Sequence, residues 1–169
     1  MLKKLLIFFI ALAPIAAVAQ DAKIAYINVQ EVFTSMPELS AIETQLAEKQ
    51  EQINNNGQAL INEFNKKLEE FEATAETASD ALKIDQQKQL ESIQERYQLF
   101  QQNSQQEMGQ LQQKLFMPLQ QKVNDAIKAI GDSNNFTYVL DVSTMPSPIV
   151  YVNPNAKDIT QEVKTKLGI

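Results

Sequence analysis

Apolar residues recur at helical spacing over most of the chain between residues 35 and 130. In the first half of this stretch they are Leu39, Ile42, Leu46, Ile53, Leu60, Phe64, Leu68 and Phe71. Such spacing places them on one face of a helix, and the sevenfold repeat that begins at Leu39 predicts a coiled-coil seam. Lys49 and Asn56 fall on the same stripe, so we expect the seam to be weak in its middle.

The apolar pattern stops at residues 74–80, where Ala, Thr and Ser dominate. Thr77, Ser79 and Asp80 can each cap a helix, which predicts a reversal of the chain here. A second stripe follows at Leu90, Ile93, Tyr97, Phe100, Ser104, Met108, Leu111, Leu115, Leu119, Val123, Ala126, Ile127 and Ile130. The sequence therefore predicts an antiparallel helical hairpin over residues 35–130, with arms of about 60 and 75 Å at 1.5 Å per residue.

The start and the interior of the hairpin carry residues with particular backbone preferences. Ser35 and Glu38 match a capping box, in which each side chain accepts from the other residue's backbone N–H. Gly57 and Gly109 are candidate hinges, because glycine costs about 1 kcal/mol relative to alanine inside a helix. A solvated face without a hinge role is the alternative for both. Pro118 is expected to kink the second helix where the hairpin leaves the rest of the protein.

The ends of the chain carry strand patterns. Residues 23–29 (KIAYINV) are apolar on both faces, which predicts a strand buried on both sides. Residues 30–34 fit one helical turn, and residues 131–135 (GDSNN) are expected to end the hairpin. Residues 136–142 and 149–152 fit two further strands, and Asp158 is expected to cap a last helix.

Residues 20–34 and 131–169 form the predicted β head. It is close to the size at which a single core rarely holds without disulfides or metals. We therefore expect oligomerisation to complete its core. The candidate interface residues are Ile24, Tyr26, Ile27, Val29, Phe136, Tyr138, Leu140, Val150 and Val152.

Residues 1–19 have the organisation of a secretory signal peptide. Lys3 and Lys4 precede the apolar run LLIFFIALA, and the run is followed by Ala-Val-Ala at residues 17–19. This predicts cleavage before Gln20. An uncleaved N-terminal anchor is the alternative.

Composition excludes most familiar catalytic devices. The 169 residues include no Cys, no His and four Gly, and the formal charge is −6. Thiolate nucleophiles, imidazole bases and glycine-rich phosphate loops are therefore absent from the sequence. We expect no enzyme activity, no cofactor, no metal site and no nucleic-acid binding. Asp141 and Asp158 could form a catalytic carboxylate pair, but the role of Asp158 as a cap already explains that residue.

Several segments resemble the Skp (OmpH-like) family of periplasmic chaperones. They are KIAYINVQEVF at 23–33, MPE at 36–38, MPLQQKVNDAIKAIG at 117–131, FTYVLDVS at 136–143 and PIVYVNPNAKDITQEVKTKLGI at 148–169. The resemblance implies an α+β, mostly helical fold and a jellyfish-like homotrimer, whose β body carries three helical tentacles around a cavity. It also implies a periplasmic protein that holds unfolded outer-membrane proteins without nucleotide and passes them to the outer-membrane assembly machinery.

The hairpin is acidic, with six basic and twelve acidic residues between 48 and 113. This argues against contact with membranes or lipopolysaccharide and against electrostatic capture of acidic clients. The candidate client-binding residues are Phe64, Phe71, Leu99, Phe100 and Met108. The alternative for most of them is that they join the two helices, and Leu99 lies off the seam. An alternative function is that of a coiled-coil adaptor or spacer in the cell envelope.

Overall fold

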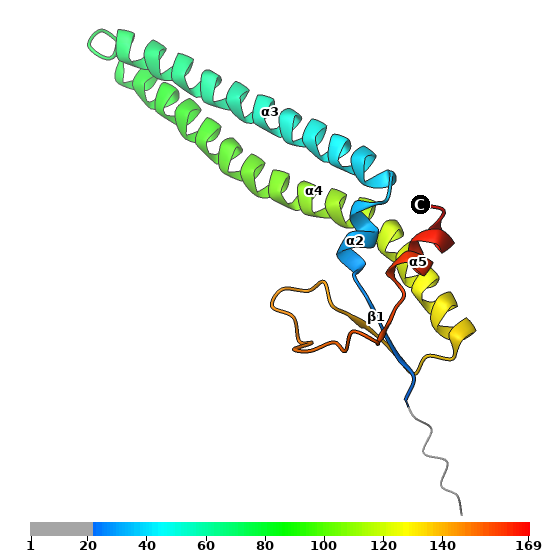
Figure 1. The fold of residues 1–169 in the computed structure, drawn as a ribbon. Coiled ribbons are helices and arrows are strands. Elements are labelled where there is room, and N and C mark those ends of the chain that lie inside the picture. The colour runs from blue at the N-terminus through cyan, green and yellow to red at the C-terminus, as the bar shows by residue number, and fades with distance from the viewer. Residues whose placement is uncertain (1–21) are drawn as a thin grey trace, which may run out of the picture.

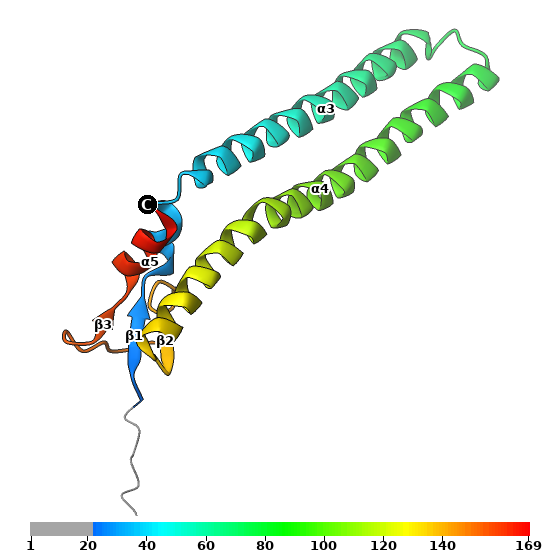
Figure 2. The same ribbon diagram turned by 90° about the vertical axis from the view of Figure 1, so that its right-hand side faces the viewer.

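The computed structural model describes residues 22–169, and the predicted signal peptide at residues 1–19 lies outside them. A long two-helix hairpin projects from a small head that contains a sheet and short helices (Figures 1 and 2). The α+β, mostly helical fold class is confirmed. Within residues 22–169, no helix combines the length and the apolar character that a membrane span requires.

The hairpin consists of α3 (Glu38–Thr74) and α4 (Asp80–Asn134). The chain reverses between them, inside the segment where the apolar pattern stops. Of the three candidate caps, Ser79 is the N-cap of α4, and its hydroxyl oxygen accepts from the backbone N–H of Leu82 at 3.3 Å. The reversal therefore arises locally, from a cap that follows a helix end rich in small polar residues.

The seam between α3 and α4 follows the two predicted stripes, whose apolar members are all buried or half-buried. Three ion pairs also cross it, namely Glu38–Lys122, Lys49–Glu107 and Glu63–Arg96. Exposed ion pairs of this kind contribute only about 0–1 kcal/mol each. The apolar stripe is thus the main source of hairpin stability.

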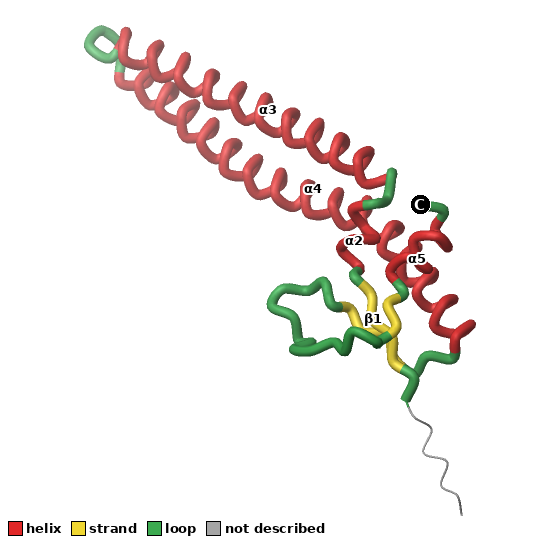
Figure 3. Tube along the Cα trace, viewed as in Figure 1, coloured by secondary structure: helices red, strands yellow, loops and turns green. Residues whose placement is uncertain are grey.

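The head contains a parallel three-stranded sheet in the order β2-β1-β3 (Figure 2), whose strands are yellow in Figure 3. Its strands are β1 (Ile24–Ile27), β2 (Tyr138–Asp141) and β3 (Lys157–Asp158). Two short helices, α2 (Val29–Thr34) and α5 (Thr160–Leu167), complete the head. The register pairs Ile24 with Tyr138 and Ala25 with Val139.

Only one face of the sheet is covered within the chain. Ala25 and Ile27 are buried, whereas Ile24 is 47% and Tyr138 60% exposed on the other face. The prediction that β1 is buried on both sides is therefore wrong for the single chain, because the core residues of α2, α4 and α5 cover only the face that carries Ala25 and Ile27.

The core of the head extends into the base of the hairpin. Its buried residues are Ala25, Ile27, Val32, Met36, Ile42, Leu119, Val123, Ala126, Ile159 and Val163. The first turns of α3 and the last third of α4 thus supply part of the apolar core that the terminal segments lack. The head is consequently larger than the sequence segments predicted for it.

Two expectations at the start of the chain are wrong. Val29 does not end the strand but begins α2, because the side chain of Asn28 caps that helix by accepting from the Glu31 N–H at 2.9 Å. The Ser35–Glu38 capping box does not form. The Ser35 hydroxyl donates instead to the Glu31 carbonyl at 2.8 Å, and Glu38 pairs with Lys122.

Three further expectations concern the C-terminal third. α4 continues through Gly131 and ends at Asn134, because Asn135 takes the left-handed conformation that terminates it, with φ 55°. Residues 149–152 form no strand, and the short segment Lys157–Asp158 pairs with β1 beside β2 in their place. The N-cap residue of α5 is Ile159 and not Asp158 as expected, but the carboxylate of Asp158 still accepts from the Thr160 N–H at 2.8 Å at the start of this helix.

Pro118 lies inside α4 without ending it. The ribbon of α4 curves over the yellow-green stretch that includes this residue, where the helix passes from the hairpin to the head (Figure 2). A proline in a helix interior removes one backbone hydrogen bond and favours such a bend.

Candidate functional site

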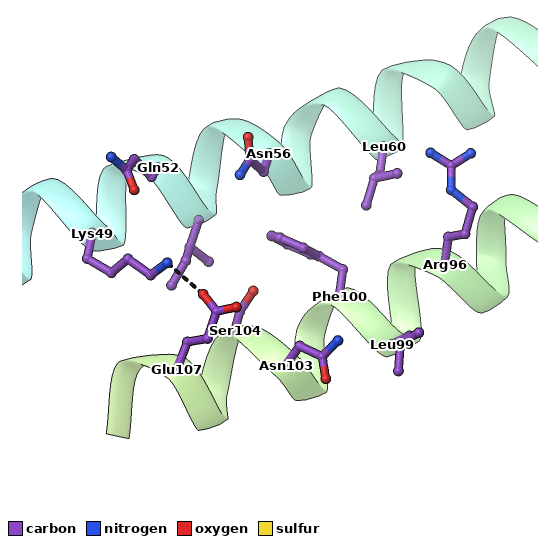
Figure 4. Close-up of a pocket in the computed structure, with 11 residues that line it drawn as sticks. Lys49, Gln52, Asn56, Leu60, Arg96, Leu99, Phe100, Asn103, Ser104 and Glu107 are labelled. Atoms are coloured by element: carbon purple, nitrogen blue, oxygen red, sulfur yellow. Dashed lines mark hydrogen bonds and ion pairs between the residues drawn. The ribbon is translucent and has the colours of Figure 1, made fainter. Parts of the chain in front are cut away.

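The middle of the hairpin is the part of the seam that side chains fill least. Phe100 reaches from α4 toward α3 between Asn56 and Leu60 (Figure 4). It packs at Gly57, where a Cβ would lie only 3.2 Å from the Phe100 Cε1 atom. Gly57 and Ser104 are both buried here, and neither has the volume to fill the space beside the aromatic ring. The seam therefore opens on both sides of Phe100.

One side is a cleft of about 450 Å³ that we call the charged groove. It is lined by Lys49, Gln52, Ile53, Asn56, Leu60, Arg96, Leu99, Phe100, Asn103, Ser104 and Glu107. The Lys49 Nζ atom lies 2.6 Å from the Glu107 carboxylate across this cleft (Figure 4). Arg96 forms a two-point ion pair with Glu63 at 2.9 and 3.2 Å. Charged side chains thus bridge α3 and α4 along this side.

The other side is a cleft of about 710 Å³ that we call the amide groove. Its lining, all within residues 22–169, has no charged side chain. Primary amides rim it, from Gln50, Asn54, Gln58, Gln101, Gln105 and Gln112. Its apolar lining comes from Ile53, Ile61, Tyr97, Phe100 and Met108.

Each groove continues toward the tip of the hairpin. The amide groove leads into a hollow of about 240 Å³ that shares Ile61 and Tyr97 with it and adds Phe64 and Gln98, again without a charged residue among those described. The charged groove leads into one of about 280 Å³ that shares Arg96 with it and adds charged side chains from both helices. One side of the hairpin is therefore charged and the other uncharged both in the middle of the seam and closer to the tip.

The five candidate client-binding residues are divided between these surfaces. Phe100 and Met108 line the amide groove, and Phe64 lines its extension. Leu99 points away from α3, borders the charged groove and is 58% exposed (Figure 4). Phe71 is half-buried near the tip and lines neither groove.

Two of the candidate hinges differ in their surroundings. Gly57 is buried against Phe100, so a close contact accounts for it independently of any hinge. In the described part of the chain, no side chain lies within 4 Å of a Cβ built on Gly109.

The candidate interface residues fall into three groups. Ile27 is fully buried in its own core, and Val29 and Phe136 pack against that core. Four others share the open side of the sheet, which we call the outer sheet face: Ile24, Tyr26, Tyr138 and Leu140. In the loop before β3, Val150 is 98% exposed and Val152 is half-buried.

Asp141 and Asp158, the two residues of the possible carboxylate pair, both accept hydrogen bonds from backbone N–H groups. Asp141 accepts from the Val29 N–H at 3.3 Å and from the Ser143 N–H at 2.9 Å. Asp158 accepts from Thr160, as described above. Among residues 22–169, no group of three acidic, His or Cys side chains is placed to hold a metal ion.

Ion pairs shift the pKa values of Glu38, Glu70 and Lys128. The hydrogen bond from Lys122 lowers the pKa of Glu38, and the hydrogen bond from Lys67 lowers that of Glu70. The hydrogen bond to Asp132 raises the pKa of Lys128. These groups are stabilised in their charged forms, which suits ion pairing and not proton transfer at neutral pH.

Sequence reasoning missed the amide groove as a site. Ile61 and most of its amides lie beside the apolar stripe and not on it. A signal was present, since Gln50, Asn54 and Gln58 follow one another at intervals of four residues, as do Gln94 and Gln98, then Gln101 and Gln105. Residues four apart form a row on one side of a helix.

Comparisons with known proteins agree on one family. The family model described as "Outer membrane protein (OmpH-like)" matches residues 23–167. The chain is 28% identical to the Chaperone protein Skp of Yersinia enterocolitica over 91% of this chain and 90% of that protein. It is 27% identical to the Chaperone protein Skp of Pectobacterium atrosepticum over the same shares. A crystal structure from Caulobacter crescentus CB15 that is described as OmpH-like has the same fold, with a TM-score of 0.71 at 19% identity, covering 86% of this chain and 83% of the other.

Proposed function

The chain belongs to the OmpH-like family of outer membrane proteins, and from this premise we propose that it is a chaperone. Specifically, it is a holdase that binds unfolded outer-membrane β-barrel proteins and prevents their aggregation before membrane insertion. It uses no nucleotide and performs no catalysis. The name of its Yersinia and Pectobacterium relatives supports the chaperone role.

The observation that carries the proposal is the incompletely filled seam of the long hairpin. Most of this hairpin projects beyond the core of the head, so both of its sides are accessible along its length (Figures 1 and 2). Aromatic and aliphatic side chains remain half-exposed in the grooves beside Phe100. Many weak contacts of this kind hold a client and still allow its release, whereas a fully closed coiled coil offers none.

The proposal includes an assembly and a location. Three copies associate through their heads, and their hairpins surround the client. The signal peptide directs the protein to the periplasm and is cleaved before Gln20. Clients then pass to the outer-membrane assembly machinery, and folding in the membrane draws the transfer forward.

An aggregation assay tests this function. A urea-unfolded outer-membrane β-barrel protein is diluted into buffer with and without the purified protein, and light scattering is followed over time. We expect suppression of scattering at one assembly per client, and a soluble complex that carries the mass of one client. Undiminished aggregation, together with stable capture of a single folded envelope protein, would contradict the holdase and favour the adaptor.

A further inference from the structure

We infer that the amide groove is the surface on which the hairpin docks an extended segment of client polypeptide, whose backbone pairs with the amides and whose alternate apolar side chains enter the groove. This inference rests on the proposed function, because it names the part of the client that the hairpin recognises. The charged groove on the opposite side then has a structural role, because its ion pairs join α3 to α4.

The first argument is the distribution of charge. Between residues 48 and 113 the chain has six basic and twelve acidic side chains. None of them lines the amide groove or its extension, whereas Lys49, Arg96 and Glu107 line the charged groove. A neutral surface on an acidic hairpin neither attracts nor repels a segment according to its charge. Recognition must then come from groups that every polypeptide carries.

The second argument is the chemistry of the rim. Each primary amide offers two N–H donors and a carbonyl acceptor. The Gln50–Asn54 bond of 3.0 Å and the Gln58–Asn62 bond of 3.0 Å use one donor of each glutamine, so each keeps a donor and its acceptor. An extended chain presents unpaired N–H and C=O groups along its edge. Amides can pair with both kinds of group, whereas carboxylates only accept and ammonium groups only donate.

The third argument is size. The groove extends from Gln50 to Ile61 on α3 and from Tyr97 to Gln112 on α4, which is about 17 and 22 Å at 1.5 Å per residue. A strand of about five to seven residues covers the same distance at about 3.3 Å per residue. Its side chains on one face point at every second residue, so apolar residues in alternation would meet Ile61, Tyr97, Phe100 and Met108 together.

These properties favour an unfolded segment over a folded occupant. A stable interface between folded proteins buries about 800 Å² on each partner, with a well-packed apolar centre. The amide groove is a narrow strip whose rim side chains are exposed. Segments with alternating apolar residues are those that later form the strands of a β-barrel.

The test uses the full mature chain and a labelled peptide of about seven residues in which Val and Thr alternate. Fluorescence anisotropy gives its Kd, and the same peptide with N-methyl groups on alternate residues is the first comparison. N-methylation removes backbone donors but leaves the side chains unchanged. We expect it to weaken binding about tenfold, which corresponds to the loss of one or two well-formed hydrogen bonds. Equal binding of the two peptides would overturn the inference, and this arm needs no protein variant.

Matched variants locate the site. The double variant Gln101→Glu/Gln105→Glu adds two negative charges to the amide groove. The control Gln52→Glu/Asn103→Asp adds the same charge to the charged groove, and all four positions are exposed. We expect about tenfold weaker peptide binding in the first and less than about twofold change in the control. Equal effects would overturn the inference. So would a change of assembly mass in the first variant without a change in peptide binding, because that result assigns the groove to a second copy.

The aggregation assay separates this inference from the proposed function. If the wild-type protein suppresses aggregation but peptide binding does not distinguish the two variants, the groove assignment fails and the chaperone remains. If peptide binding depends on the groove but the wild-type protein does not suppress aggregation, the docking surface remains and the holdase proposal fails.

Discussion

Gly57 and Phe100 together determine how closely α3 and α4 approach in the middle of the hairpin. Because residue 57 has no side chain, the aromatic ring of Phe100 can lie against the backbone of α3. The ring occupies the centre of the seam but not its two sides, where Asn56 and Ser104 are polar and small. A larger residue at position 57 would push the ring toward one of the grooves, so a single missing side chain helps to create both.

Alanine substitution at the two hairpin glycines separates this packing role from helix propensity. Gly109→Ala should raise the free energy of unfolding by about 0.5–1 kcal/mol, because alanine favours the helix and, apart from the local helix itself, no described atom lies within 4 Å of the new Cβ. Gly57→Ala gains the same propensity but presses on Phe100 at 3.2 Å, so its gain should be smaller or negative. Urea unfolding followed by circular dichroism measures both. Equal stabilisation would show that the contact with Phe100 does not require glycine.

At the scale of elements, the base of the hairpin is part of the head. Leu119 and Val123 of α4 are buried among residues of β1, α2 and α5, whereas most of the seam beyond them is only half-buried. The chain therefore has one well-packed end, and local stability should decrease along the hairpin toward the turn. This is the arrangement that an accessible binding surface requires, since a surface sealed in a core cannot bind clients.

Two leucines in α4 test the difference in packing between the base of the hairpin and the rest of it. Leu119 is 4% exposed in the core at the base, and Leu99 is 58% exposed in the hairpin. Leu119→Ala should lower the free energy of unfolding by about 2–5 kcal/mol, because it leaves a cavity in a packed core. Leu99→Ala should change it by less than about 0.5 kcal/mol. Chemical unfolding of both variants checks the prediction, and similar values would contradict a core that includes the base of the hairpin.

The ion pair that joins the bases of α3 and α4 predicts a pH dependence. The hydrogen bond from Lys122 lowers the pKa of Glu38 below its ordinary value of 4.5. A carboxyl group whose pKa is lower in the folded than in the unfolded state stabilises the protein at pH values above its unfolded-state pKa. This contribution is lost as the pH falls through the folded-state pKa. Glu38→Gln should therefore lower the urea midpoint at pH 7, and the difference from wild type should shrink as the pH falls below about 4.5.

Glu43→Gln is the control for this measurement. Glu43 is exposed on the same helix and takes part in none of the ion pairs formed within residues 22–169. The urea midpoint of Glu43→Gln should equal that of the wild type both at pH 7 and below pH ~4.5. A Glu38→Gln deficit that persists undiminished at low pH would assign the effect to packing and not to charge.

The elements also show which features can be predicted from sequence. The two long helices and their reversal follow from local periodicity and capping, so they were predictable. The strands β1 and β2 were also predictable, since they lie inside the predicted strand segments 23–29 and 136–142. The short strand β3 was not, because it is defined by its pairing with β1 and not by its own sequence pattern. Residues 149–152 have the stronger β pattern, yet Lys157–Asp158 pairs with β1. The amide groove was missed for a related reason: it arises where the sides of two helices meet, and a search for the apolar stripe passes over the polar rows beside it.

At the scale of the whole molecule, the outer sheet face is an apolar surface of the head without cover from the described residues. Ile24 and Tyr138 lie opposite each other on adjacent parallel strands and are 47% and 60% exposed. The core residues of α2, α4 and α5 cover the other face. Association of heads through this face would cover it and place the hairpins around a common space, which is the assembly that we propose.

Charged substitutions on this face test the assembly. In Ile24→Asp/Tyr138→Asp, a closed interface would have to bury two unpaired carboxylates, which costs several kcal/mol in total. We expect light scattering to give the mass of three chains for the mature wild-type protein and of one chain for this variant. The control Ile84→Asp/Leu99→Asp adds the same charge at exposed apolar positions of the hairpin and should keep the wild-type mass.

A single-chain mass for the wild-type protein would contradict the proposed association of three copies. A variant that retains the wild-type mass would show instead that the heads associate through another surface, for which the exposed loop at Val150 and Tyr151 is the next to substitute.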